Sequence, residues 1–180
     1  MWKKEVPELR FNLLKTSQKR KLKDDLMKTF PRLTKEMLDL LLPPKEDFSV
    51  AKIQGTKTLL YVDHNKQPVF WDHEGRDDLY PTVYTLWTLP EFMPTFTIVP
   101  SAFSFLKNGA DLMLPGVVIP PGNTLQFAVG EKWSVTLEGY PKPVGVGITV
   151  ISSQKAYADQ MKGKVLAMHH LFSDHLWKLG

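Results

Sequence analysis

Cysteine is absent from all 180 residues of this chain. Its absence rules out disulfide bonds, Cys-ligated zinc sites and thiol nucleophiles. The sequence also lacks any apolar run close to the ~18 residues that a membrane-spanning helix needs. Its first residues, MWKKEVPELR, do not contain the apolar core of a secretory signal. We therefore expect a cytoplasmic protein without a membrane partner.

Catalytic and cofactor-binding motifs are equally scarce. The glycines of GADLMLPG, residues 109–116, are not followed by the Lys-Ser or Lys-Thr of a phosphate-binding P-loop. The glycines at 145 and 147 have no third glycine at the dinucleotide-binding spacing. No serine lies in a Gly-x-Ser-x-Gly elbow. The sequence thus predicts neither an enzyme nor a cofactor site.

Three histidines near the C-terminus, His169, His170 and His175, are the main candidates for a metal site. Adjacent residues of a strand point to opposite faces, so His169 and His170 would not meet at one ion. We expect no metal, and the role of these histidines stays open.

Positive charge is concentrated at the start of the chain. Residues 1–35 hold 11 Lys+Arg and 4 Asp+Glu, a net +7, whereas the remainder holds 12 and 15, a net −3. Such an asymmetry favours a polyanionic partner, with nucleic acid ahead of a membrane surface. A solvated helix face is the alternative reading.

Part of this charge falls on a predicted helix that runs from a cap at Ser17 to Phe30. Leu22, Leu26 and Phe30 share one face at a spacing of four residues. The cations on the other faces are candidate phosphate ligands: Lys19, Arg20, Lys21 and Lys23.

Beyond this helix the periodicity changes from helical to alternating. Thr34 is expected to cap a second helix, KEMLDLLL. The segments DFSVAKIQ, TLLYVD and PVFWD then predict strands of an antiparallel meander. The next segment, YPTVYTLWTLPEFMP, fits helix and strand alike. Its aromatic residues indicate either a buried seam between two domains or a face that binds another protein.

From about Thr95 the pattern indicates a second domain. A short helix, SAFSFLKN, is expected to begin at a Ser101 cap. Several short apolar segments follow, each ended by Gly or Pro, and this pattern is typical of a small β-barrel. The fold class expected is α+β, with an N-terminal domain at 1–93 and a barrel at 94–180.

The stretch GADLMLPG joins the short helix to the barrel. Gly109 is suited to end the helix with a positive φ, and Asp111 is expected to bond to nearby backbone N–H groups. Residues 112–114 read as a short buried strand that a Pro-Gly turn ends. Backbone amides left free at Gly109 would bind phosphate or a base edge, with Lys107 and Asn108 beside them. Plain barrel architecture is the competing interpretation.

Three segments, LYPTVYTLWTLPEFMPTFT, GADLMLPGVVIPPG and SDHLWKLG, together resemble the N-terminal region of the ligatin family, also called eukaryotic translation initiation factor 2D. The malignant T-cell-amplified family is a related one. The resemblance implies a pre-PUA domain, with two helices and an antiparallel sheet, followed by a PUA-type RNA-binding barrel. Gly130-Glu131 departs from the Gly-Asp of many PUA barrels, and no RNA contact is assigned there.

The resemblance also implies a function. The family would bind rRNA of the small ribosomal subunit, and the acceptor end of tRNA, without enzymatic activity or a cofactor. It would support GTP-independent tRNA delivery to the P site, non-standard initiation and post-termination recycling, together with further C-terminal domains. The alternative is an accessory PUA domain of an RNA-modifying enzyme. The RNA surface implied comprises Lys107, Gly109, Ala110, Asp111, Leu114, Pro115 and Gly116, with Asn108 beside them.

Overall fold

The computed structural model describes residues 2–122 and 125–180, which form two compact units. The N-terminal unit comprises Lys4–Phe92 and His175–Gly180, and the barrel unit comprises the residues up to Lys3 and Met93–Asp174. These units differ from the predicted division at 93/94 at both ends of the chain. The residues up to Lys3 belong to the barrel unit, and the last six residues belong to the N-terminal unit. The last six residues are held there because the Tyr84 ring stacks on Trp177, and the Tyr84 hydroxyl donates to the Trp177 carbonyl at 2.7 Å.

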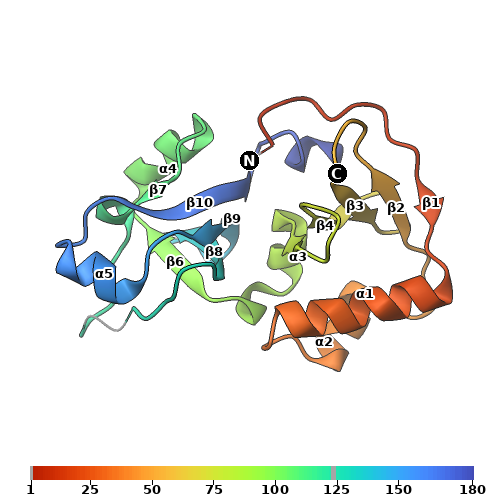
Figure 1. The fold of residues 1–180 in the computed structure, drawn as a ribbon, viewed down its shortest axis with the longest axis horizontal. Helices are drawn as coiled ribbons and strands as arrows, with labels where there is room; N and C mark the ends of the chain where they lie inside the picture. Colours follow the sequence, from red (N-terminus) through yellow and green to blue (C-terminus); the bar gives the residue numbers. More distant parts are fainter. Residues whose placement is uncertain (1, 123–124) are drawn as a thin grey trace. The chain divides into compact units, whose positions relative to one another are not determined.

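The N-terminal unit contains a five-stranded antiparallel sheet whose strands follow each other in chain order (Figure 1). This is the predicted meander, with one short strand added at each edge. The strands are β1 (Asn12–Leu13), β2 (Ser49–Lys52), β3 (Leu59–Val62), β4 (Pro68–Asp72) and β5 (Leu79–Pro81).

Three helices belong to the same unit: α1 (Thr16–Thr29), α2 (Lys35–Leu41) and α3 (Val83–Thr88). The apolar face of α1 is buried as predicted. Its predicted cap is wrong, because α1 begins at Thr16, where the Lys15 N–H bonds to the Gln18 side chain at 2.9 Å. The predicted cap of α2 is confirmed, since the Thr34 hydroxyl accepts from the Met37 N–H.

The aromatic segment YPTVYTLWTLPEFMP, whose pattern fitted helix and strand alike, contains both a strand and a helix. It forms β5, then α3, then the short 3₁₀ turn η1 (Pro90–Phe92). Thr82 separates strand from helix because its hydroxyl accepts from the Thr85 N–H and donates to the Pro68 carbonyl at 2.7 Å. Trp71 and Tyr80 stack in the core with 5.3 Å between their ring centroids.

The barrel unit is built on a second five-stranded sheet, in the order β6-β8-β9-β10-β7. β6 and β8 are parallel and the other pairs are antiparallel. After β7 the chain returns to β6, where Val118 N–H donates to the Thr97 carbonyl at 2.8 Å, so the sheet curls into a half-barrel. The strands are β6 (Thr95–Ile98), β7 (Leu112–Met113), β8 (Lys132–Leu137), β9 (Pro143–Thr149) and β10 (Lys164–Leu171).

Short helices complete the barrel unit: α4 (Pro100–Lys107), the 3₁₀ turn η2 (Leu114–Gly116) and α5 (Ser153–Ala158). The Ser101 cap is wrong because Pro100 occupies the first helical position, which favours a residue with fixed φ and no N–H. Rings of Phe96, Phe127 and Trp133 pack at the centre of the core. A further 3₁₀ turn, η3 (Trp177–Leu179), lies in the N-terminal unit.

Candidate nucleic-acid interface

The corner between α4 and β7 is formed by a tight helix end. Gly109 has a φ of +88°, the left-handed region in which glycine carries no steric cost. Its N–H donates to the Leu106 carbonyl at 2.9 Å, and the Ala110 N–H donates to the Phe105 carbonyl at 3.1 Å. This pair of bonds is the Schellman motif. The expectation of free amides here is therefore wrong, because capping the helix uses both donors.

Asp111 anchors this corner to the sheet. Its Oδ1 accepts from the Met168 N–H at 2.9 Å, and its Oδ2 lies 3.1 Å from the Lys164 Nζ. The expected bonds to nearby backbone are thus replaced by bonds to β10, more than fifty residues later. Burial alone would raise the pKa of Asp111, but the Met168 and Lys164 hydrogen bonds outweigh it and hold that pKa below its usual value.

The segment after Asp111 is only partly buried. Leu112 and Leu114 lie in the core, whereas the Met113 side chain is 48% exposed, so the prediction of three buried residues is wrong at Met113. The alternation of a strand explains this, because successive side chains point to opposite faces. Leu114, Pro115 and Gly116 then form η2, the predicted turn.

A groove of about 360 Å³ lies between α4 and the β7–η2 segment. Figure 1 shows these elements side by side in the barrel unit. A Cβ on Gly116 would lie only 2.9 Å from the Ala102 Cβ, so glycine allows the two segments to pack closely. The groove is mainly apolar, and its lining comprises Val99, Ser101, Ala102, Phe105, Leu106, Ala110, Asp111, Leu112, Met113, Pro115 and Gly116.

Phe105 is a residue of this groove that the sequence analysis did not single out. Its side chain is 65% exposed at the edge of the groove, opposite the exposed Met113. Exposed aromatic rings on RNA-binding modules stack on unpaired bases. A signal was present, because Phe105 directly precedes the buried Leu106, and helical spacing turns neighbouring residues to different faces.

Two other predicted residues lie at the end of α4. Lys107 is the last residue of α4, and Asn108 is its C-cap. Both side chains are exposed. Of the predicted set, Ala110, Asp111, Pro115 and Gly116 line the groove. Lys107, Asn108, Gly109 and Leu114 are not among its lining residues.

The predicted cations of α1 lie in the other unit, and three of them have partners there. Lys19 donates to the Glu46 carbonyl at 2.7 Å, and partial burial, followed by the Lys23 charge, lowers the pKa of Lys19. Lys23 Nζ lies 2.6 Å from Asp39 Oδ1. Arg20 is exposed.

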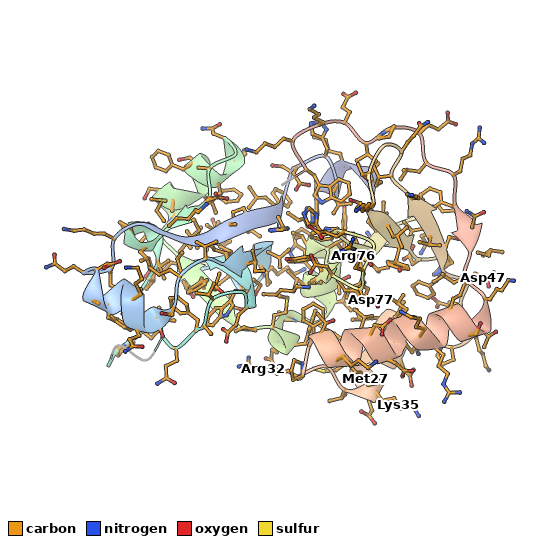
Figure 2. All side chains as sticks on the ribbon, in the orientation of Figure 1. Met27, Arg32, Lys35, Asp47, Arg76 and Asp77 are labelled. Carbon is orange, nitrogen blue, oxygen red and sulfur yellow. The ribbon has the colours of Figure 1, made fainter. Side chains whose placement is uncertain are left out.

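Lys21 is the third of these paired cations. Its Nζ lies 2.6 Å from Asp25 Oδ2 and 2.9 Å from Asp77 Oδ1, and the hydrogen bonds to Asp25 and then Asp77 raise the pKa of Lys21. Figure 2 labels Asp77, which lies in the β4–β5 loop beside α1. Lys19, Lys21 and Lys23 therefore make contacts within the N-terminal unit.

The C-terminal histidines do not form a metal site within the described parts of the chain, where no group of three or more His, Cys, Asp or Glu could hold an ion. His170 is buried, and its Nδ1 lies 2.8 Å from Asp174 Oδ2. Asp174 also accepts from the Leu171 N–H at 2.9 Å, so this contact fixes the end of β10.

Among residues 2–122 and 125–180, no helix is long and apolar enough to cross a membrane.

Comparison with known families identifies both units. Residues 10–90 match the pre-PUA-like domain, and residues 93–175 match the PUA domain of eIF2D. The chain is homologous to the N-terminal region of eukaryotic translation initiation factor 2D. The bovine factor is 38% identical over 170 residues, which cover 93% of this chain and 29% of the factor. The chain thus spans under a third of the length of such relatives.

Shorter relatives match over most of their own length. Translation machinery-associated protein 20 of Schizosaccharomyces pombe is 28% identical, covering 92% of this chain and 89% of that protein. The Drosophila melanogaster homolog of malignant T-cell-amplified sequence 1 is 27% identical, with 92% and 88% covered. The chain is therefore similar to both of these shorter proteins over nearly all of its own length.

Solved structures share the fold. A hypothetical protein of Pyrococcus horikoshii superposes with a TM-score of 0.72 at 23% identity, covering 94% of this chain and 99% of that one. A PUA domain protein of Aeropyrum pernix superposes at 0.70 and 22% identity, covering 96% and 91%. This likeness concerns the fold alone.

Proposed function

We propose that this chain is a non-enzymatic RNA-binding region of a translation factor. It binds rRNA of the small ribosomal subunit and the acceptor end of tRNA. Within a longer protein it supports GTP-independent tRNA delivery to the P site, non-standard initiation and post-termination recycling. Homology to factor 2D supports the translation role, and the groove beside Phe105 supports the RNA contact.

The groove is suited to an unpaired nucleotide. Its apolar lining accommodates the face of a base, and the exposed Phe105 ring and Met113 thioether provide the stacking surfaces. Lys107 and Asn108 at the helix end supply a charge and amide donors for a phosphate or a base edge. Such a site favours single-stranded loops and ends over duplex RNA, because paired bases do not expose their faces.

An accessory PUA domain of an RNA-modifying enzyme is the second candidate. The same groove would then present RNA to a catalytic domain elsewhere. Homology over 93% of the chain to an initiation factor favours the first candidate.

Co-sedimentation of the 180-residue chain with purified small ribosomal subunits tests the proposal. We expect binding that weakens steeply between 50 and 200 mM KCl, as about 10³–10⁵-fold losses accompany 6–10 phosphate contacts. Lys107→Glu is expected to weaken binding further. Association that is insensitive to salt and unaffected by Lys107→Glu would contradict an RNA site at this corner.

A further inference from the structure

The corner around Gly109 carries negative charge that would repel a phosphate. The last carbonyls of a helix carry roughly half a negative elementary charge. Asp111 adds a carboxylate two residues after Gly109. The N–H groups of Gly109 and Ala110, which would otherwise attract an anion, are bound to the carbonyls of Leu106 and Phe105. An RNA backbone at this corner therefore depends on cationic side chains.

Two lysines lie near this corner. Their combined positive charge only slightly exceeds the negative charge of Asp111 and the helix end. Lys107 is exposed at the end of α4. Lys164 Nζ lies 3.1 Å from Asp111 Oδ2, so the two charges largely neutralise each other. Counting Lys107, Lys164, Asp111 and the helix end leaves roughly half a positive charge.

Lys3 adds a full positive charge at the same place. The residues up to Lys3 belong to the barrel unit, far in sequence from its other members. A Cβ on Gly109 would lie 3.2 Å from the Lys3 Cε and 3.4 Å from its Nζ. The aliphatic part of Lys3 thus crosses Gly109 at contact distance, in space that any other residue at 109 would fill. Lys3 is exposed, so its ammonium group remains open to a ligand.

The charge of Lys3 also reaches Asp111. Burial alone would raise the pKa of Asp111, and Lys3 is among the neighbours that lower it, after Met168 and Lys164. Lys3, Lys107 and Lys164 therefore act on one small region of the surface.

We propose that Lys3 is a phosphate-binding residue of the α4–β7 site, recruited from the start of the chain to make this corner attractive to RNA. This inference rests on the proposed function, since it assigns a ligand group to the same site. It commits to the phosphate of a ribonucleotide next to the base that stacks on Phe105.

The test measures dissociation constants of the 180-residue chain for purified small ribosomal subunits at several KCl concentrations. Lys3→Ala should weaken binding several-fold and reduce the log–log salt slope by roughly 0.7–0.9, the loss of one phosphate contact. Lys3→Arg should restore both. Lys4→Ala is the matched control, because Lys4 is also exposed but belongs to the N-terminal unit, and it should bind as the unmodified chain does.

Each remaining outcome separates this inference from the proposed function. Wild-type binding by Lys3→Ala, together with weakened binding by Phe105→Ala, overturns the role of Lys3 and keeps the site. Equal losses in Lys3→Ala and Lys4→Ala also overturn it, since they indicate only diffuse charge. If Phe105→Ala and Lys3→Ala both bind as wild type, the proposed site itself is refuted. Circular dichroism establishes that each variant is folded.

Discussion

The Tyr84 and Trp177 rings stack face to face, with 4.2 Å between their centroids and 9° between their planes. The Tyr84 hydroxyl also donates to the Trp177 carbonyl at 2.7 Å, and Trp87 packs on the same indole at 4.9 Å. These contacts fasten the segment His175–Gly180 to α3 in the N-terminal unit. Trp177 therefore contributes to the stability of a unit most of whose residues lie before residue 93.

Replacing Trp177 should destabilise the N-terminal unit. Trp177→Ala removes two aromatic pairs, each worth about 0.5–1.5 kcal/mol beyond the area that it buries, so we expect a loss of about 1–3 kcal/mol. Urea unfolding followed by circular dichroism measures this change. Lys178→Ala, an exposed neighbour, is the control and should change little. A Trp177→Ala chain as stable as the control would show that the stack does not hold this segment.

Phe105 should carry a large share of RNA affinity. Phe105→Ala removes a stacking surface worth about 1–3 kcal/mol per base, while the fold should be retained because the ring is 65% exposed. Fluorescence anisotropy with a labelled single-stranded rRNA fragment measures the effect. Tyr140→Ala offers a matched control, since Tyr140 is a 64% exposed aromatic of the same unit outside the groove. Equal effects of the two substitutions would refute a specific stack.

Asp111 should make stability depend on pH in the acidic range. Its pKa is lowered on folding, so its contribution is present above about pH 4, the ordinary aspartate value, and is lost as the pH falls through the folded pKa. Asp111→Asn should cost up to about 1 kcal/mol at pH 7, a modest figure because the ion pair is partly solvated.

The deficit of Asp111→Asn should shrink as the pH falls below 4, because the wild-type carboxyl becomes protonated as the pH passes through its lowered folded pKa. Urea unfolding at pH 7, 4 and 3 measures it. Glu138→Gln controls for the change in net charge, since Glu138 is exposed in the same unit. A deficit that stays constant across this pH range would indicate that the charge of Asp111 does not matter.

The cations of α1 should differ in effect, with Arg20 contributing to RNA binding and Lys23 to the stability of the fold. Arg20→Ala should weaken binding to small ribosomal subunits and lower the salt slope by roughly 0.7–0.9, with stability unchanged. Lys23→Ala should instead reduce stability by up to about 1 kcal/mol, because it breaks the ion pair with Asp39. Salt-dependent sedimentation and urea unfolding of both variants separate the two effects. Equal salt slopes for Arg20→Ala and the unmodified chain would exclude α1 from the RNA contact.

Local sequence patterns were sufficient for most of the fold. The spacing of Leu22 and Leu26 identified α1, and alternation identified the three central strands of the first sheet. In the second half, the Gly and Pro breaks indicated a β-barrel without fixing its strands. The predicted starts of two helices were wrong, because a neighbouring residue starts the helix in place of the predicted capping serine. Gln18 moved the start of α1, and Pro100 moved the start of α4.

The sequence predicted the corner that carries the candidate site, but not the contacts that build this corner. The glycine at 109 marked the corner, because a positive φ there has a local signature. The partners of that corner come from distant parts of the chain: Met168 and Lys164 from β10, and Lys3 from the start of the sequence. Pairing over such separations depends on how the sheet curls, which no local pattern encodes.

The central claim is that the α4–β7 groove holds RNA, and site-specific crosslinking tests it most directly. A photoreactive p-benzoylphenylalanine in place of Met113, which is 48% exposed in the groove, is irradiated in the presence of purified small ribosomal subunits. We expect crosslinks to rRNA from this position and few from the same residue in place of Tyr140. Crosslinks from position 113 to ribosomal proteins alone would contradict RNA binding in the α4–β7 groove.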